Sequence, residues 1–212
     1  MGSLLASGIS TTANAATFSE ATEVTASSVL SSLPVKGRAP KTGYDRDKLF
    51  GEWADPDGNG CDARNDILAR DLTNKVFGVG RDKCLVLSGT LLDPYSGKYF
   101  SFVRGQGTST LIPIDHVVAV SDAWQKGAFK WDATTRINFY NDPLNLMTTQ
   151  RALNSQKKDG DAATWLPPLK SFRCEYIARQ IAVKAKYAIW VTKAEKEAMA
   201  RILTACPKQP LP

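Results

Sequence analysis

The sequence predicts an α+β fold that is stapled by disulfides and ends in a helical hairpin. Hydrophobic residues make up 43% of the 212 residues and charged residues 23%, an ordinary composition for one globular domain. Short β-rich runs in the middle of the chain and a helical period near its end indicate that strands and helices occupy separate stretches. No apolar stretch of the sequence approaches the roughly 18–20 residues that a membrane span requires.

Three parts of the chain are expected. Residues 1–16 end in a small-x-small site of the kind that signal peptidase cuts, although the usual basic start is missing. We interpret residues 1–40 as a leader remnant followed by a Ser/Thr/Ala-rich low-complexity arm, with a tail that has no targeting role as the alternative. Residues 41–207 form the expected single domain, and residues 208–212 form a tail.

The first half of this domain is expected to combine a helix with a β-hairpin. A short helical turn follows residue 44, and Asp62 is a good N-cap for a helix over residues 63–72. Residues 83–105 contain two β-rich runs around the turn formers of residues 93–97, which predicts a hairpin.

A Gly/Asp-rich loop precedes the first helix. "DPDGNGCDARND", residues 55–66, resembles an EF-hand calcium loop, but its twelfth residue is Asp66 and no convincing helix precedes it. We interpret the loop as a polar turn into the helix, with a calcium site as the alternative.

The second half is expected to contain two extended segments and several helices. Residues 110–120 and 143–150 read as extended, and Ser121 and Asp132 are candidate N-caps for helices over residues 122–128 and 133–141. Residues 151–160 read as a brief helix or turn. Apolar residues from 174 to 188 recur at helical spacing, and a Thr-x-x-Glu capping box at 192–195 starts a last helix, which Pro207 stops.

The four cysteines predict two disulfides and an oxidising compartment. No CxxC is present, and one histidine is too few for the usual Cys/His zinc sites. Cys174 and Cys206 lie at similar distances on either side of the helical turn, so a bridge between them is geometrically reasonable. Cys61 and Cys84 then form the second bridge, and each bridge is expected to stabilise the fold by about 2–4 kcal/mol.

The single histidine, His116, directly follows a carboxylate, Asp115, at the end of an extended run. Imidazole is the side chain that titrates near neutral pH, as the general base of phosphodiester hydrolysis must. Asn145 and Asn154 follow, then Lys157, and carboxylate and amide oxygens are the ligands that Mg²⁺ or Mn²⁺ prefers. The net charge of +6 favours a polyanionic partner, nucleic acid first among them.

This set of residues resembles the HNH endonuclease family, and specifically its Asp-His, Asn, Asn variant, as in the HNH domain of CRISPR effector nucleases. The resemblance implies a ββα-metal core in which His116 is the general base and Asp115 and Asn154 hold Mg²⁺ or Mn²⁺. Asn145 would organise the loop that orients His116, and Lys157 would approach the phosphate. Arg64, on the first helix, is a further candidate for lining the cleft.

The similarity extends along residues 44–206. The stretches that carry it resemble secreted bacterial HNH proteins related to the C-terminal domain of GmrSD-type restriction enzymes: "YDRDKLFGEWADPDGNGCDARNDIL", "SGTLLDPYSG", "IDHVVAVSDAWQKGA" and "WLPP…CEYIARQIAVKAKYAIWVT". Such proteins often read DHVVPL, whereas Ala119 and Val120 stand in the last two places here. The expected function is therefore a secreted or cell-surface endonuclease, monomeric, acting on DNA rather than RNA.

Two other functions are consistent with the sequence. A secreted, non-catalytic polyanion-binding or cell-surface module would need His116 only as a structural residue. A Ser/His/Asp hydrolase is disfavoured, because the chain lacks a Gly-x-Ser-x-Gly elbow and an Asp adjacent to the histidine cannot easily orient the ring.

Overall fold

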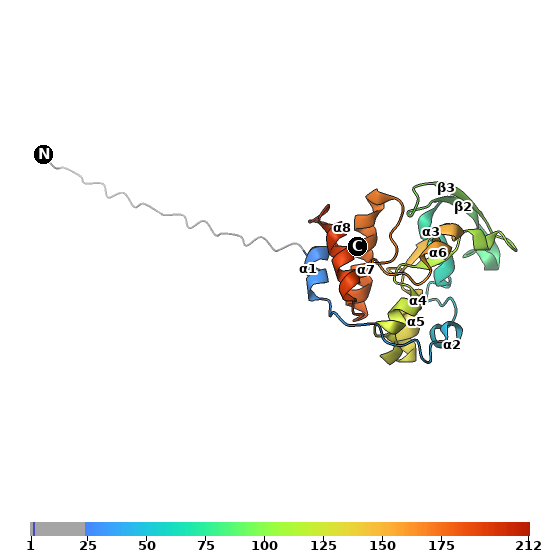
Figure 1. The fold of residues 1–212 in the computed structure, drawn as a ribbon. Helices are drawn as coiled ribbons and strands as arrows, with labels where there is room; N and C mark the ends of the chain where they lie inside the picture. The colour runs from blue at the N-terminus through green and yellow to red at the C-terminus, as the bar shows by residue number, and fades with distance from the viewer. Residues whose placement is uncertain (1, 3–23) are drawn as a thin grey trace.

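A computed structural model describes Gly2 and residues 24–212. The leader expected over residues 1–16 therefore lies outside the described residues, apart from Gly2. The elements follow in chain order (Figure 1): α1 (Ala26–Ser32), α2 (Arg46–Phe50), α3 (Ala63–Asp71), β1 (Leu72–Phe77), η1 (Gly80–Asp82), β2 (Val86–Leu92), β3 (Tyr99–Val103), η2 (Ser109–Leu111), β4 (Ile114–His116), α4 (Val120–Gln125), η3 (Ala128–Lys130), α5 (Ala133–Asn141), β5 (Leu146–Thr148), α6 (Arg151–Lys157), η4 (Lys170–Phe172), α7 (Arg173–Lys186) and α8 (Lys193–Leu203).

The strands form two small antiparallel sheets, which confirms the α+β class. One sheet has the order β1-β2-β3, and the other pairs β4 with β5. The β2–β3 hairpin was predicted, but β1 was not. In β1 only Leu72 is buried, so the strand shows none of the in-out alternation by which a sequence reveals a strand. The extended run expected over residues 110–120 is a strand only at Ile114–His116.

Three hydrophobic clusters make up the core, and they correspond to the three groups of elements in Figure 1. The first lies among α1, α7 and α8, the second is rich in aromatic residues from α2, α4 and α5, and the third joins α3 to the sheets. The residues of β4 and the turn after it contribute to all three, with Val117 in the first cluster, Val118 in the second and Ile114 in the third. The strand that carries Asp115 and His116 is therefore held from several sides.

Residues 25–33 and Pro210 pack on the rest of the fold, although the sequence analysis assigned them to an arm and a tail. A capping box of Thr25 and Ser28 starts α1, which buries Ala26 and Leu30 against the C-terminal helices. Thr25 forms a bridge with Pro210, so the expected tail pairs with the start of α1. The Ser/Thr/Ala-rich composition concealed the apolar face of α1.

Most of the predicted helix starts are confirmed. Asp62 caps α3, Asp132 caps α5, and Thr192 with Glu195 forms the capping box of α8. The prediction for Ser121 was wrong, because α4 starts two residues earlier than expected, at Val120, and its N-cap, Ala119, offers no side-chain bond. None of the helices in the described part of the chain is long and apolar enough to cross a bilayer.

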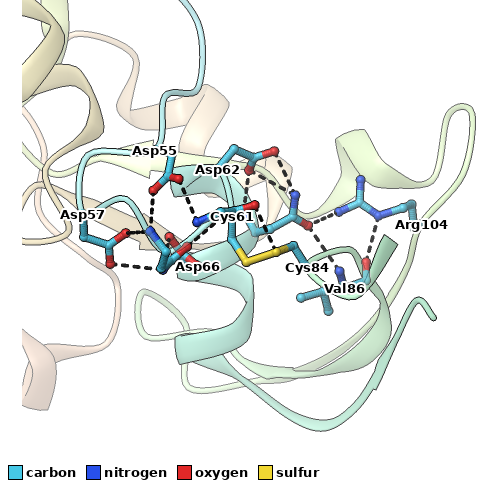
Figure 2. Close-up of a disulfide and its surroundings, with 11 residues drawn as sticks. Asp55, Asp57, Cys61, Asp62, Asp66, Cys84, Val86 and Arg104 are labelled. Carbon is cyan, nitrogen blue, oxygen red and sulfur yellow. Dashed lines mark hydrogen bonds between the residues drawn. A yellow bond between two sulfur atoms is a disulfide. The ribbon is translucent and has the colours of Figure 1, made fainter. Parts of the chain in front are cut away.

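Both predicted disulfides are present. Cys174, on the first turn of α7, is bonded to Cys206, just beyond α8, and thus closes the helical hairpin. Cys61 is bonded to Cys84 and joins the loop before α3 to the segment that enters β2 (Figure 2).

The loop before the Cys61–Cys84 bridge is a polar turn, as predicted. The carboxylates of Asp55 and Asp57 accept hydrogen bonds from the backbone N–H of Asn59, and Asp55 also accepts one from Gly60 (Figure 2). These bonds shape the turn by satisfying its own backbone donors. Within residues 24–212, no group of three or more His, Cys, Asp or Glu side chains is placed to hold a metal ion, so the calcium alternative gains no support.

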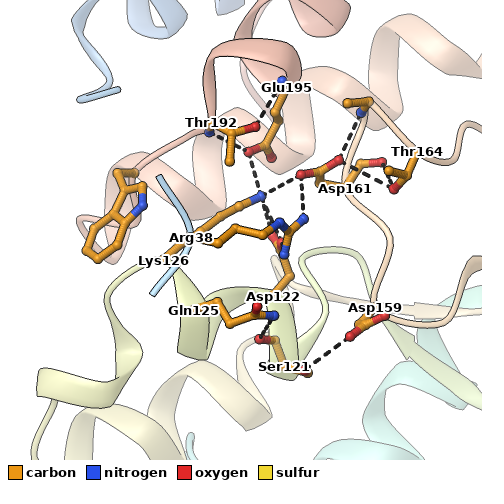
Figure 3. A network of polar contacts seen from close by, with 12 residues as sticks. Arg38, Ser121, Asp122, Gln125, Lys126, Asp159, Asp161, Thr164, Thr192 and Glu195 are labelled. Carbon is orange, nitrogen blue, oxygen red and sulfur yellow. Dashed lines mark hydrogen bonds and ion pairs between the residues drawn. The ribbon is translucent and has the colours of Figure 1, made fainter. Parts of the chain in front are cut away.

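A buried network of charges joins the N-terminal segment to α4, α7 and α8 (Figure 3). Lys126 is fully buried, and its Nζ atom lies within 3 Å of three carboxylates: 2.7 Å from Asp122, 2.8 Å from Asp161 and 2.6 Å from Glu195. Two further cations complete the balance: Lys184, which pairs with Glu195 at 2.9 Å, and Arg38, which pairs with Asp122 and Asp161. Lysines on helices are usually solvated, but Lys184 is part of the core here.

Replacing Lys126 by methionine is expected to lower the free energy of unfolding by about 3–5 kcal/mol, because three buried carboxylates would lose their shared cation. Urea denaturation measures the loss. Lys193→Met, on the exposed start of α8, is the matched control and should change stability by less than about 0.5 kcal/mol. Equal effects of the two substitutions would contradict this account of the network.

Candidate active site

The pairing of β4 with β5 builds the candidate site. Asp115 is opposite Met147 and His116 is opposite Leu146, and the backbone N–H of Val117 donates to the carbonyl of Asn145 over 2.8 Å. Helix α6 follows β5 after two residues, and its last residue, Lys157, reaches back to β4. Segments that are distant in sequence thus meet around the Asp-His pair.

The carboxylate of Asp115 is almost fully buried, and both of its oxygens have partners. The hydroxyl of Tyr95 donates to Oδ2 over 2.6 Å, and the ammonium of Lys157 lies 3.0 Å from Oδ1. The same ammonium donates to the carbonyl of His116 over 2.8 Å. Burial, and then the negative charge of Asp115, raises the pKa of the Tyr95 hydroxyl well above its usual range, so this hydroxyl stays protonated and remains a donor.

A second carboxylate holds Tyr95 in position. Asp93 is fully buried in the turn of the β2–β3 hairpin, and its Oδ1 accepts hydrogen bonds from the hydroxyl of Thr149 and the backbone N–H of Gln150. These bonds dock the hairpin turn onto the junction between β5 and α6. Tyr95 follows Asp93 in the same turn and is thereby carried to Asp115.

The ring of His116 lies on the opposite face of β4, because successive side chains of a strand alternate. Trp53 stacks on it with ring centroids 6.0 Å apart and planes 11° apart, Tyr140 lies at 4.5 Å, and Phe139 stacks at 6.5 Å. Only 4% of His116 is exposed. The ring is therefore enclosed by aromatic side chains.

The environment of His116 sets its protonation state. Burial, with the nearby charge of Arg46 second, lowers the pKa of the imidazole from the ordinary 6.5 to about 3. The ring is thus neutral at physiological pH. Its Nε2 lies 2.8 Å from the carbonyl of Tyr140, which can only accept, so Nε2–H donates and the other nitrogen, Nδ1, is the basic atom.

Asn145 holds the turn that follows His116. It is fully buried, its Oδ1 accepts a hydrogen bond from the backbone N–H of Val118, and its Nδ2 donates to the carbonyl of the same residue. An amide can satisfy both groups of one residue, which a hydrophobic side chain of equal size cannot. These contacts are what the loop-organising role expected of Asn145 requires, while its effect on catalysis stays a prediction.

The other two candidates, Asn154 and Arg64, form no hydrogen bond or ion pair with Asp115 or His116 among the described residues. Asn154 lies half-buried on α6, and its side chain forms no hydrogen bond with any of the described residues. Arg64 donates to the carbonyl of Ser109 over 3.3 Å, and burial, followed by the charge of Arg104, lowers its pKa. Lys157 points inward to Asp115, whereas the resemblance placed it at a phosphate.

The residue types fit a hard cation, but in this arrangement a lysine already lies on the carboxylate. The ammonium of Lys157 is 3.0 Å from Oδ1 of Asp115, and the Tyr95 hydroxyl donates to Oδ2. The ammonium also supplies the positive charge that this buried carboxylate needs. As the side chains lie, a Mg²⁺ or Mn²⁺ ion at Asp115 would lie against the buried ammonium of Lys157.

Two partners in this site, Tyr95 and Trp53, escaped the sequence analysis. Tyr95 lies among the turn residues 93–97, and Trp53 lies beside the Gly/Asp-rich loop of residues 55–66. A general signal existed, because the hydroxyl of a buried tyrosine almost always finds a hydrogen-bond partner. Nothing in the spacing of the sequence identified Asp115 as that partner, since the two lie on different elements.

Comparison with known proteins supports the family that the sequence resembles. Residues 62–202 match the family described as GmrSD restriction endonucleases, C-terminal domain, and this span includes all of β4, β5 and α6. The chain belongs to this family. It is also 38% identical, over 185 residues, to an uncharacterized secreted protein of Arthroderma benhamiae, covering 86% of this chain and 85% of that protein. That relative is fungal, so the likeness is not confined to bacterial proteins. No solved structure matches the chain significantly.

The single histidine allows a direct test of its environment by NMR. In the native protein the His116 ring signals should not titrate between pH 8 and pH 5, because the pKa is about 3. Since the folded-state pKa lies below the ordinary 6.5, protonation opposes folding. The contribution of His116 to stability is therefore complete above pH 6.5 and is lost progressively as the pH falls toward 3. The control for the NMR titration is the urea-unfolded chain, in which His116 should titrate near its ordinary pKa of 6.5. A native midpoint near neutral pH would show that the ring is open to water.

Proposed function

We propose that this protein is a secreted or cell-surface endonuclease that hydrolyses phosphodiester bonds of nucleic acid, DNA rather than RNA. The observation that carries the proposal is the pairing of β4 and β5. Strand β4 carries the adjacent residues Asp115 and His116, and α6, which follows β5 in the chain, contacts Asp115 through Lys157. Membership of the restriction-endonuclease domain family supports a nuclease-like activity. Two disulfides and a relative that is named as secreted support the location outside the cytoplasm.

In this proposal His116 is the general base. Its Nε2–H is fixed on the carbonyl of Tyr140, so Nδ1 is the atom that takes a proton from the attacking water. Asn145 keeps the turn after β4 in place and thereby fixes the ring's position. Because the His116 residue is only 4% exposed, water and substrate reach Nδ1 only when the side chains around the ring, Trp53 among them, move aside.

The remaining assignments belong to the same proposal. Lys157 and Arg64 are the proposed contacts to substrate phosphate, and a divalent ion, Mg²⁺ or Mn²⁺, is the proposed cofactor at Asp115 and Asn154. For Lys157 to contact phosphate, its ammonium must first leave Asp115, where it now lies.

Cleavage of supercoiled plasmid tests the proposal. His116→Ala should lower the cleavage rate by about 10²–10⁴-fold, because the general base is lost. EDTA should abolish cleavage, and added Mg²⁺ or Mn²⁺ should restore it. Ile114→Val, on the same strand but outside the proposed chemistry, is the matched control and should cut at nearly the parental rate. Cleavage by the His116→Ala protein at the parental rate would exclude His116 as the base.

The second candidate is a polyanion-binding module without catalysis, which the enclosure of His116 favours. This alternative predicts that the protein retains DNA without cutting it. Binding would be indifferent to EDTA and would weaken steeply as salt rises, because lysine and arginine contacts release counterions. Retention and cleavage measured in parallel on one plasmid separate the two functions.

A further inference from the structure

The pair formed by Asp115 and Lys157 is closed off from solvent. The side chain of Lys157 is 0% exposed and that of Asp115 is 6% exposed. The ammonium has two oxygen partners, Oδ1 of Asp115 at 3.0 Å and the carbonyl of His116 at 2.8 Å. Removing one member of such a buried pair costs free energy, because the charge of the other member then stays buried without a partner. Lys157 therefore acts as a built-in counter-ion.

A divalent ion and this ammonium exclude each other. Both would bind Oδ1 of Asp115, and two positive charges so close together repel strongly in a buried site. The Tyr95 hydroxyl donates to Oδ2, so that oxygen also has a partner already. An incoming metal ion must therefore displace Lys157 and does not add to it.

The surroundings of α6 offer a place for the displaced ammonium. Lys157 also lines a surface cavity of about 470 Å³, together with Lys158, Asp159, Gln156 and Trp165. The Asp159 carboxylate in this cavity is 45% exposed and pairs with Lys41 at 2.6 Å. A lysine at the end of a short helix can turn its flexible stem from Asp115 into this polar space.

We propose that Lys157 is the resident cation of the Asp115 site and that it competes directly with divalent metal ions for the carboxylate. The inference rests on the proposed function, in which Asp115 is a metal ligand, and it adds the residue that controls access to that ligand. Metal binding is then weak in the parental protein, because the ion must first displace an ammonium that the fold supplies.

The test is a titration of the full, oxidised chain with Mn²⁺ in a phosphate-free buffer, in which isothermal calorimetry measures the Kd. Lys157→Met and Lys157→Gln remove the ammonium, and glutamine retains a hydrogen-bond donor. Both should lower the Kd for Mn²⁺ by about tenfold or more relative to the parental protein. Lys158→Met, which removes the adjacent exposed charge, is the matched control and should leave the Kd nearly unchanged. The double variant Asp115→Asn, Lys157→Met should bind Mn²⁺ as weakly as the parental protein. This result would show that the tighter binding of the Lys157 variants takes place at Asp115.

Two results would overturn the proposal: a Kd for the Lys157 variants equal to the parental value, or a gain that persists in the double variant. If the variants are unfolded without metal, thermal unfolding followed by circular dichroism replaces calorimetry. Mn²⁺ should then restore the folding transition, and failure to restore it counts against the proposal. The titration does not depend on catalysis, so a parental protein that binds Mn²⁺ as expected but never cuts DNA would refute the proposed nuclease function and leave this inference intact.

Discussion

A buried carboxylate requires a counter-charge, and at Asp115 this requirement organises the candidate site. Lys157 supplies the charge from α6, and Tyr95 supplies a hydrogen bond from the turn of the β2–β3 hairpin. Asp93 fastens that turn to the start of α6. Two segments that lie far apart along the chain, α6 and the hairpin turn, are thus tied to one short strand. The Lys126 network applies the same rule on a larger scale, where it joins the N-terminal segment to the C-terminal hairpin.

The alternation of side chains along β4 gives its two polar residues different environments. Asp115 faces a lysine and a tyrosine hydroxyl, whereas His116 faces aromatic rings and a single backbone carbonyl. The carboxylate is consequently neutralised and the imidazole is kept neutral and oriented. Both groups are covered in this arrangement, the one by Lys157 and the other by Trp53. The polar centre of the domain is therefore closed, and any chemistry there depends on side chains that can move aside.

Features that depend on a few neighbouring residues were predictable. The N-caps at Asp62 and Asp132, the capping box at Thr192 and the β2–β3 hairpin follow from local hydrogen bonds and turn chemistry, and all of them are present. Local reasoning failed where the pattern was weak. Helix α1 was hidden by its serines, and β1 shows no alternation because nearly all of it is exposed.

The sequence by itself determined the α+β class, both disulfide pairings, the family and the short list of polar residues around His116. Turn signals, helical spacing and four cysteines are sufficient for the class and the disulfides, whereas the family and the residue list follow from the resemblance of the quoted stretches. Only the tertiary structure decided which of those residues touch. Lys157 contacts Asp115, Asn145 holds the turn after His116, and Arg64 and Asn154 form no hydrogen bond with either residue among the described residues. The physical reason is that burial and charge compensation act between elements brought together by packing, and no spacing along the chain records those distances.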